Sequence, residues 1–255
     1  MRSLLAAFHF LTVLPLPGSH HLRDKDWGRA TAWYPAVGLV LGAILAALAW
    51  GLYRLWPGGV AAALLLLAWM FLTGALHLDG FVDCCDALLA PVPRERRLEI
   101  LHDVHVGAFG LVGVVLLLLL KYSALVALPA GFRLPALLLI PVLGRWGMTG
   151  AVLLWPYARP GAGLGRKART GAGRGQLAIA TLTMLVVVGL AWWAGLGWVA
   201  LALVLLTAGV TLIVARWMAS QLGGLTGDAY GTLCELTETA NLLVLVGLTH
   251  TGVLA

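Results

Sequence analysis

Seven apolar stretches, each near 20 residues long, follow one another along this chain, with polar segments between them. About 20 apolar residues are needed for a helix to cross the hydrocarbon core of a bilayer. A helix also satisfies its own backbone hydrogen bonds, as lipid requires. The chain is therefore predicted to be an all-α, polytopic integral membrane helix bundle of about seven transmembrane helices, in a single membrane domain over 1–255. The predicted spans are 31–53, 59–76, 108–128, 134–155, 177–195, 197–217 and 236–255.

The composition excludes an ordinary soluble domain. Hydrophobic residues make up 61% of the chain and charged residues 11%, whereas about a quarter of a soluble domain is charged. The net charge is +6, but the basic residues fall between apolar stretches, where membrane topology explains them. They are not interleaved with aromatic residues, so no nucleic acid is expected as a partner. The lipid bilayer is the expected partner of the apolar surface.

Residues 1–30 precede the first predicted span. Their start is similar to a signal peptide, but no small-residue cleavage site follows, and Pro15 and Pro17 break the apolar run. The run is too short to cross a bilayer. An interfacial or re-entrant segment is therefore expected.

Charge counting orients the bundle. With the N-terminus in the cytoplasm, thirteen of the 17 basic residues lie on the cytoplasmic side, and only Arg54 and Arg133 lie on the outer side. Lys121 and Arg145 fall within spans. The positive-inside rule favours this orientation, in a cell inner membrane.

The same orientation puts three long polar stretches on the cytoplasmic face, as loops near 77–107, 156–176 and 218–235. Nine of the 11 acidic residues lie in or beside two of these stretches, and the other two lie in the N-terminal segment. An active site that faces the cytoplasm is therefore expected.

The first candidate motif is an acidic stripe after the second span. Asp79, Asp83 and Asp86 lie at i, i+4 and i+7, and so share one helix face. Like charges on one face repel, and ionisable groups beside an apolar span are costly. Bound Mg²⁺ would offset both costs, because it takes carboxylate oxygens together with substrate phosphates. Gly80 leaves room for a substrate near the backbone. The simpler alternative for the three aspartates is a solvated helix start, where acidic residues are favoured.

The second motif contains His102, Asp103 and His105. Asp103 is a candidate metal ligand. The two histidines are candidate ligands, proton carriers or phosphate partners, with an ordinary interface position as the alternative. Zinc is a weak alternative because no second compact His/Cys set is evident.

The third motif contains Arg159, Gly163 and Gly165, and more basic residues follow it. Glycines with interspersed cations suit a phosphate-binding loop, although a flexible, positively charged cytoplasmic loop has the same composition. Arg145, within a predicted span, needs a carboxylate or a phosphate as a partner inside the bundle.

The fourth motif is a glycine-rich turn that contains Gly224 and Thr226 and projects Asp228. Glu235 and Glu238 follow at i, i+3 on one helix face. A second carboxylate group that faces the first would make a metal pair, which activates an attacking oxygen and stabilises a leaving one.

These four motifs, in this order, resemble the cobalamin synthase family, the adenosylcobinamide-GDP ribazoletransferases, over nearly the whole chain. The segment 10–17 is similar to the family's opening, and 74–88 is similar to its central signature. The chain departs from the family in having His102 and His105 where basic residues are expected. It also has Cys84 and Cys85 where small polar residues are common.

The resemblance implies the last assembly step of the cobalamin nucleotide loop. Adenosylcobinamide-GDP would react with α-ribazole, or with its 5′-phosphate, to give adenosylcobalamin, or its phosphate, and GMP, with Mg²⁺ as the cofactor. Such transfer depends mainly on positioning and charge neutralisation. A homo-oligomer is possible.

The hypothesis assigns each candidate residue a role. The metal ligands are Asp79, Asp83, Asp86, Asp103 and Glu235. Asp228 or Asp83 takes the proton of the attacking hydroxyl, and Arg145 and Arg159 neutralise phosphate charge. The residues expected at the substrates are His77, Gly80, His102, His105, Gly163, Gly165, Gly224 and Thr226.

Three alternatives stay open at the level of sequence. A CDP-alcohol-type phosphotransferase acting on a lipid has a related Asp/Gly pattern, but its full pattern is not present. A membrane transporter is compatible with Arg145 and the acidic stripe, although no inverted repeat is found. A membrane scaffold is the simplest of the three.

Overall fold

The chain is helical throughout the part that the computed structural model describes, which is residues 1–16, 22–158 and 163–252. In that part, the only strand-like pairing is an isolated bridge between Tyr157 and Leu225. The all-α prediction is confirmed. The helices are α1 (Arg2–Leu11), α2 (Asp24–Ala30), the 3₁₀ turn η2 (Thr31–Trp33), α3 (Tyr34–Leu55), α4 (Gly58–Leu72), α5 (Leu76–Leu89), α6 (Arg94–Ile100), α7 (Ala108–Ala127), α8 (Ala130–Leu154), α9 (Leu164–Gly171), α10 (Arg174–Ala191), the π turn η3 (Trp192–Leu196), α11 (Trp198–Leu222) and α12 (Gly227–His250).

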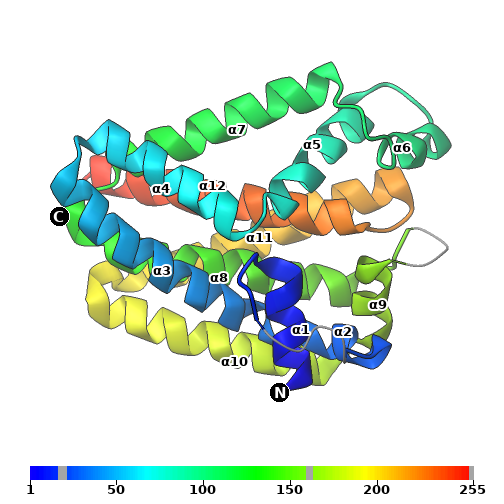
Figure 1. Ribbon diagram of the computed structural model, residues 1–255, viewed down its shortest axis with the longest axis horizontal. Helices are drawn as coiled ribbons and strands as arrows, with labels where there is room; N and C mark the ends of the chain where they lie inside the picture. The colour runs from blue at the N-terminus through cyan, green and yellow to red at the C-terminus, as the bar shows by residue number, and fades with distance from the viewer. Residues whose placement is uncertain (17–21, 159–162, 253–255) are drawn as a thin grey trace.

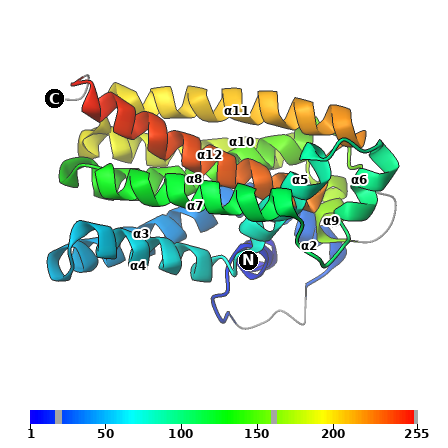
Figure 2. The ribbon, with the colours of Figure 1, turned by 90° about the horizontal axis from the view of Figure 1, so that it is seen from above.

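Six helical stretches in the described residues are long and apolar enough to cross a membrane, and the bent pair α4 and α5 makes a seventh if it counts as one span. In two perpendicular views, α7, α8, α10, α11 and α12 run along the long axis of the molecule (Figure 1 and Figure 2). The chain is therefore a multi-pass membrane helix bundle, as predicted.

Two helices form the centre of the bundle. In the apolar windows of α8 and α12, 72% and 61% of the residues are buried, against 28–39% in the other spans. Polar residues in α8 and α12 are consequently surrounded by protein and need partners from neighbouring helices.

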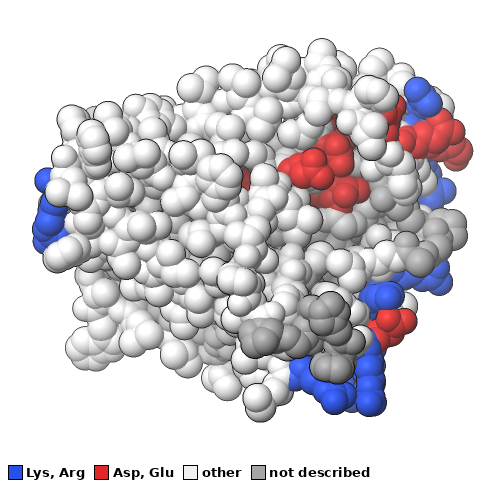
Figure 3. Space-filling view, viewed as in Figure 1, with Lys and Arg blue, Asp and Glu red and all other residues white. Residues whose placement is uncertain are grey.

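Charge is distributed as a membrane slab requires. In Figure 3, Lys and Arg side chains gather at the two ends of the long axis, and the surface between them is largely uncharged. The acidic side chains on this face lie towards the end that carries α5, α6 and α9. That end is the one predicted to face the cytoplasm.

A sharp bend separates α4 from α5. The two helices meet at 90°, and Gly74 and Ala75 between them both have a left-handed backbone, with φ of 60° and 55°. For a residue with a side chain, such as Ala75, a left-handed backbone conformation costs about 1–2 kcal/mol. The bend places His77 and Asp79 in the first turn of α5.

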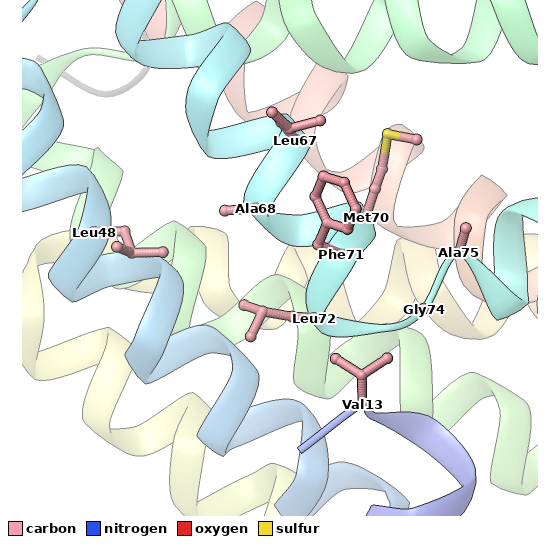
Figure 4. Close-up of a pocket in the computed structure, with 9 residues that line it drawn as sticks. All are labelled: Val13, Leu48, Leu67, Ala68, Met70, Phe71, Leu72, Gly74 and Ala75. Atoms are coloured by element: carbon pink, nitrogen blue, oxygen red, sulfur yellow. The ribbon is translucent and has the colours of Figure 1, made fainter. Parts of the chain in front are cut away.

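An apolar cavity of about 650 Å³ adjoins this bend. Figure 4 shows its lining, which comes from α3, α4, the bend and Val13. None of its nine lining residues has a titratable or polar side chain. It therefore offers no group for acid–base or metal chemistry.

Two of the stretches expected as loops are mostly helical. The stretch 77–107 contains most of α5 and all of α6, and 218–235 is interrupted only at the turn 223–226. Helix α12 begins well before the predicted span 236–255, because its polar residues are buried against other helices instead of solvated. Helix α1 is apolar but short, and it lies across the long helices (Figure 1).

Candidate active site

Helices α5 and α12 pack backbone against backbone at two glycines. A Cβ on Gly80 would lie 2.8 Å from the Cα of Asp228, and one on Gly231 would lie 3.0 Å from the Cα of His77. The Thr232 hydroxyl lies 3.0 Å from the carbonyl oxygen of Gly80 and 2.9 Å from that of Asp228. The first and fourth motifs are thereby brought together, and Gly80 serves helix packing.

A cavity of about 210 Å³ opens where these helices meet. Of the predicted residues, Asp79, Asp228, His77 and Gly165 line it, so the first, third and fourth motifs all contribute. A Cβ on Gly165 would lie 3.1 Å from the ring of Tyr157, so glycine here leaves room for that ring. The other lining residues are Phe10, Leu76, Met148, Tyr157, Leu164, Gly227, Tyr230 and Gly231.

The turn 223–226 is tied to the third motif by backbone hydrogen bonds. The Ala158 N–H donates to the Leu225 carbonyl at 2.8 Å, and the Leu225 N–H donates to the Pro156 carbonyl at 2.9 Å. Gly224 has φ of 152°, and a Cβ there would lie 2.6 Å from the Pro156 oxygen. Gly224 therefore shapes the turn that holds Tyr157 beside the cavity.

Thr226 caps α12. Its hydroxyl oxygen accepts from the Ala229 N–H at 3.2 Å, and its hydroxyl lies 3.2 Å from Oδ2 of Asp228. Threonine is a favoured residue at this helix position. Gly224 and Thr226 thus fix the position of Asp228, and neither lines the cavity.

Asp86 points to the start of α7. Its two carboxylate oxygens accept from the N–H groups of Gly107 and Gly110, each at 2.8 Å. A carboxylate at a helix N-terminus satisfies unpaired N–H groups and interacts favourably with the helix dipole. Asp83 lies between Asp79 and Asp86 on α5 and is half-buried. The structure thus brings only Asp79 of the stripe to the cavity lining.

The second motif forms a turn of its own between α6 and α7. The Asp103 Oδ1 accepts from the backbone N–H of His105 at 3.1 Å and lies 2.6 Å from its Nδ1. These bonds lower the pKa of Asp103 below its usual value. The Nδ1 of His102 lies 2.8 Å from the carbonyl oxygen of Leu98. These three exposed side chains do not line the cavity.

Arg145 and Glu235 belong to a buried ionic cluster. Glu238 accepts from Arg145 and, at 2.9 Å, from Lys121, while Lys121 lies 2.5 Å from Glu235. The exposed fractions of these side chains are at most 10%. The carboxylate partner expected for Arg145 is thus Glu238, and Glu235 faces Lys121.

Among the eight lining residues that sequence reasoning did not predict as site residues are the aromatic ones, Phe10, Tyr157 and Tyr230. A usable signal was present, since Tyr157 stands two residues before Arg159 and Tyr230 two residues after Asp228. It also missed Lys121 as the partner of the acidic pair. A lysine within a span requires a carboxylate from another span. Arg159 lies outside the described residues, and Gly163 is described but does not line the cavity.

The carboxylates at the cavity suit a metal ion whose ligands come partly from the substrate, and not one that is enclosed by protein ligands alone. In the described residues, no three His, Cys, Asp or Glu side chains gather closely enough to hold a metal ion. Mg²⁺ usually takes only one or two carboxylates and completes its shell with water and substrate phosphate. Asp79 and Asp228 can supply these two carboxylates, so the residues fit Mg²⁺ bound together with a phosphorylated substrate.

Comparison with known proteins gives one consistent result. The family model described as cobalamin-5-phosphate synthase matches residues 3–246. A Roseiflexus protein named adenosylcobinamide-GDP ribazoletransferase is 40% identical, over 94% of this chain and 87% of its own. Proteins of the same name from Stutzerimonas stutzeri and Geotalea daltonii are 43% and 39% identical, each over 97% of this chain and 98% of its own. No solved structure matches.

Proposed function

The chain belongs to the cobalamin-5-phosphate synthase family, and on that premise we propose that the cavity between α5 and α12 is the active site of an adenosylcobinamide-GDP ribazoletransferase. The observation that carries this proposal is that Asp79 and Asp228, from motifs far apart in the sequence, line one cavity. Neither the lipid phosphotransferase nor the transporter is favoured by the family match. The activity belongs to cobalamin synthesis.

The proposed reaction is a phosphoryl-group transfer. A ribose hydroxyl of α-ribazole, or of its 5′-phosphate, attacks the cobinamide-linked phosphorus of adenosylcobinamide-GDP and forms a new P–O bond. The bond from that phosphorus to the bridging oxygen breaks, and GMP leaves with the bonding electrons. Asp228 receives the hydroxyl proton, because it starts α12 at the cavity and its carboxylate is held by the Thr226 hydroxyl.

Asp79 and Asp228 would hold Mg²⁺ together with the diphosphate oxygens. The ion, when bound, would neutralise charge on the diphosphate and on the departing GMP. The main task of the chain is then to orient the two substrates, since this class of reaction depends chiefly on positioning and electrostatics.

The size of the cavity limits what enters it. At about 210 Å³ it is smaller than the roughly 300–1,000 Å³ of sites that enclose drug-sized ligands. It has room for the reacting phosphates and not for a corrin ring. The corrinoid would therefore stay outside the cavity, on its cytoplasmic side. In this proposal the protein lies in the cell inner membrane with its N-terminus in the cytoplasm.

The test is α-ribazole-dependent GMP release. The purified full chain, in detergent or in liposomes, is incubated with Mg²⁺ and adenosylcobinamide-GDP, with and without α-ribazole or its phosphate. We expect GMP only when the second substrate is present, and no GMP when Mg²⁺ is chelated. CMP release from a CDP-alcohol in place of this activity, or transport without any product, would contradict the proposal.

A further inference from the structure

The cavity is lined by two residues whose polar atoms are buried and unpaired. His77 is 2% exposed and Tyr230 is 4% exposed, and both line the cavity. Within the described part of the chain, His77 Nε2 and the Tyr230 hydroxyl have no hydrogen-bond partner. Leaving a buried polar atom unpaired costs about 1–3 kcal/mol. Two such atoms at one cavity therefore indicate a polar ligand that supplies their missing hydrogen-bond partners.

The other nitrogen of His77 determines where its proton lies. Nδ1 lies 3.4 Å from Nη2 of Arg145. A guanidinium group has only N–H donors and no acceptor, so Nδ1 must present its lone pair to Arg145. The neutral ring then carries its proton on Nε2, the nitrogen without a partner.

Arg145 is held in place by the buried ionic cluster. It donates to Glu238, which also accepts from Lys121 at 2.9 Å. Lys121 in turn pairs with Glu235, so the cluster contains two cations and two carboxylates. A buried ion pair adds little stability compared with apolar side chains. What this cluster adds is a fixed guanidinium group behind His77.

We propose that His77 donates a hydrogen bond from Nε2 to an oxygen of the phosphate under attack, and that Arg145 is a positioning residue that holds the imidazole in this tautomer. The inference rests on the proposed function. A fixed neutral donor stabilises the negative charge that develops on the phosphoryl oxygens. Because its Nε2 carries a proton, it has no lone pair on that atom and does not compete with Asp79 and Asp228 for the metal.

Two substitutions at His77 test the donor. The amide nitrogen of a glutamine can reach the position of Nε2, whereas that of an asparagine ends near the position of Nδ1. For GMP release, we expect His77→Asn to lower kcat about 10²–10³-fold, as the loss of one such donor does, with little change in KM. His77→Gln should stay within about tenfold of the wild type.

His9 offers a matched control, because its Nε2 is also buried and unpaired but the residue does not line the cavity. His9→Asn should therefore keep the wild-type rate. Equal loss of activity in His77→Asn and His77→Gln, or wild-type activity in both, would overturn the role of His77. Absence of GMP release from the wild type itself would contradict the proposed function instead.

The tautomer can be measured directly. Nitrogen NMR of ¹⁵N-histidine-labelled full chain in detergent, assigned with His77→Gln, should show a protonated Nε2 and an unprotonated Nδ1. Arg145→Lys should give a mixture of tautomers and a lower kcat, because an ammonium group cannot bridge Glu238 and His77 in the same way. A proton on Nδ1 in the wild type would overturn the proposal.

Discussion

Asp79 and Asp228 carry the negative charge that the cavity offers to a metal ion or to a proton. Their surroundings differ. Asp228 begins a buried helix and lies beside the Thr226 hydroxyl, whereas Asp79 is exposed on the first turn of α5. In the proposed function both residues would hold the metal, and proton transfer is better matched to the more constrained Asp228.

Replacement of either carboxylate should separate these roles. Asp79→Asn and Asp228→Asn should each lower kcat for GMP release, and Asp228→Asn should do so by about 10²–10⁴, the range for loss of a catalytic acid–base group. Asp79→Asn should also raise the Mg²⁺ concentration that gives half the maximal rate. Glu99→Gln, which removes only an exposed pair with Arg96, serves as the control. A wild-type rate in either aspartate variant would remove that residue from the active site.

At the level of helices, Asp86 joins α5 to the start of α7. Asp86→Ala should lower the free energy of unfolding by about 0.5–2 kcal/mol, the usual cost of losing a helix cap, and Asp86→Asn should cost less because it keeps an oxygen acceptor. Thermal unfolding in detergent measures both. The Mg²⁺ requirement for GMP release should not change. If Asp86→Ala raised that requirement as Asp79→Asn is expected to, Asp86 would be a metal ligand, as the acidic stripe predicts.

The spans were predictable from sequence because apolar length is a direct consequence of bilayer thickness. The bend at Gly74 and Ala75 was not, because a left-handed pair in an apolar run changes no hydropathy. The start of α12 was also misplaced, since Glu235 was assigned to the cytoplasmic loop 218–235 but is buried within the helix. Spacing placed Asp79 and Asp86 on one face, yet their partners depend on how α5 packs against α7 and α12.

At the level of the whole molecule, the chain has two unlike ends. The turn between α3 and α4 lies at the end predicted to be outside, and α6 lies at the end predicted to be cytoplasmic. Cysteines introduced one at a time can test this orientation, because the native Cys84, Cys85 and Cys234 are all buried. In spheroplasts, a membrane-impermeant maleimide should label Trp56→Cys and not Glu95→Cys, and both after lysis. The reverse pattern would contradict the cytoplasmic active site.

The buried ionic cluster connects three spans, α7, α8 and α12, so removing one of its partners should destabilise the bundle, because a buried charge is left unpaired. Lys121→Met leaves Glu235 without its cation and should destabilise the protein by about 3–5 kcal/mol, seen as a lower midpoint of thermal unfolding in detergent. Lys167→Met is the matched control, since its partner Asp24 is 80% exposed and such surface pairs contribute at most about 1 kcal/mol. Adding Glu235→Met to Lys121→Met should recover much of the loss, because Arg145 and Glu238 remain paired. Equal midpoints for the two lysine variants would show that the cluster does not join these spans energetically.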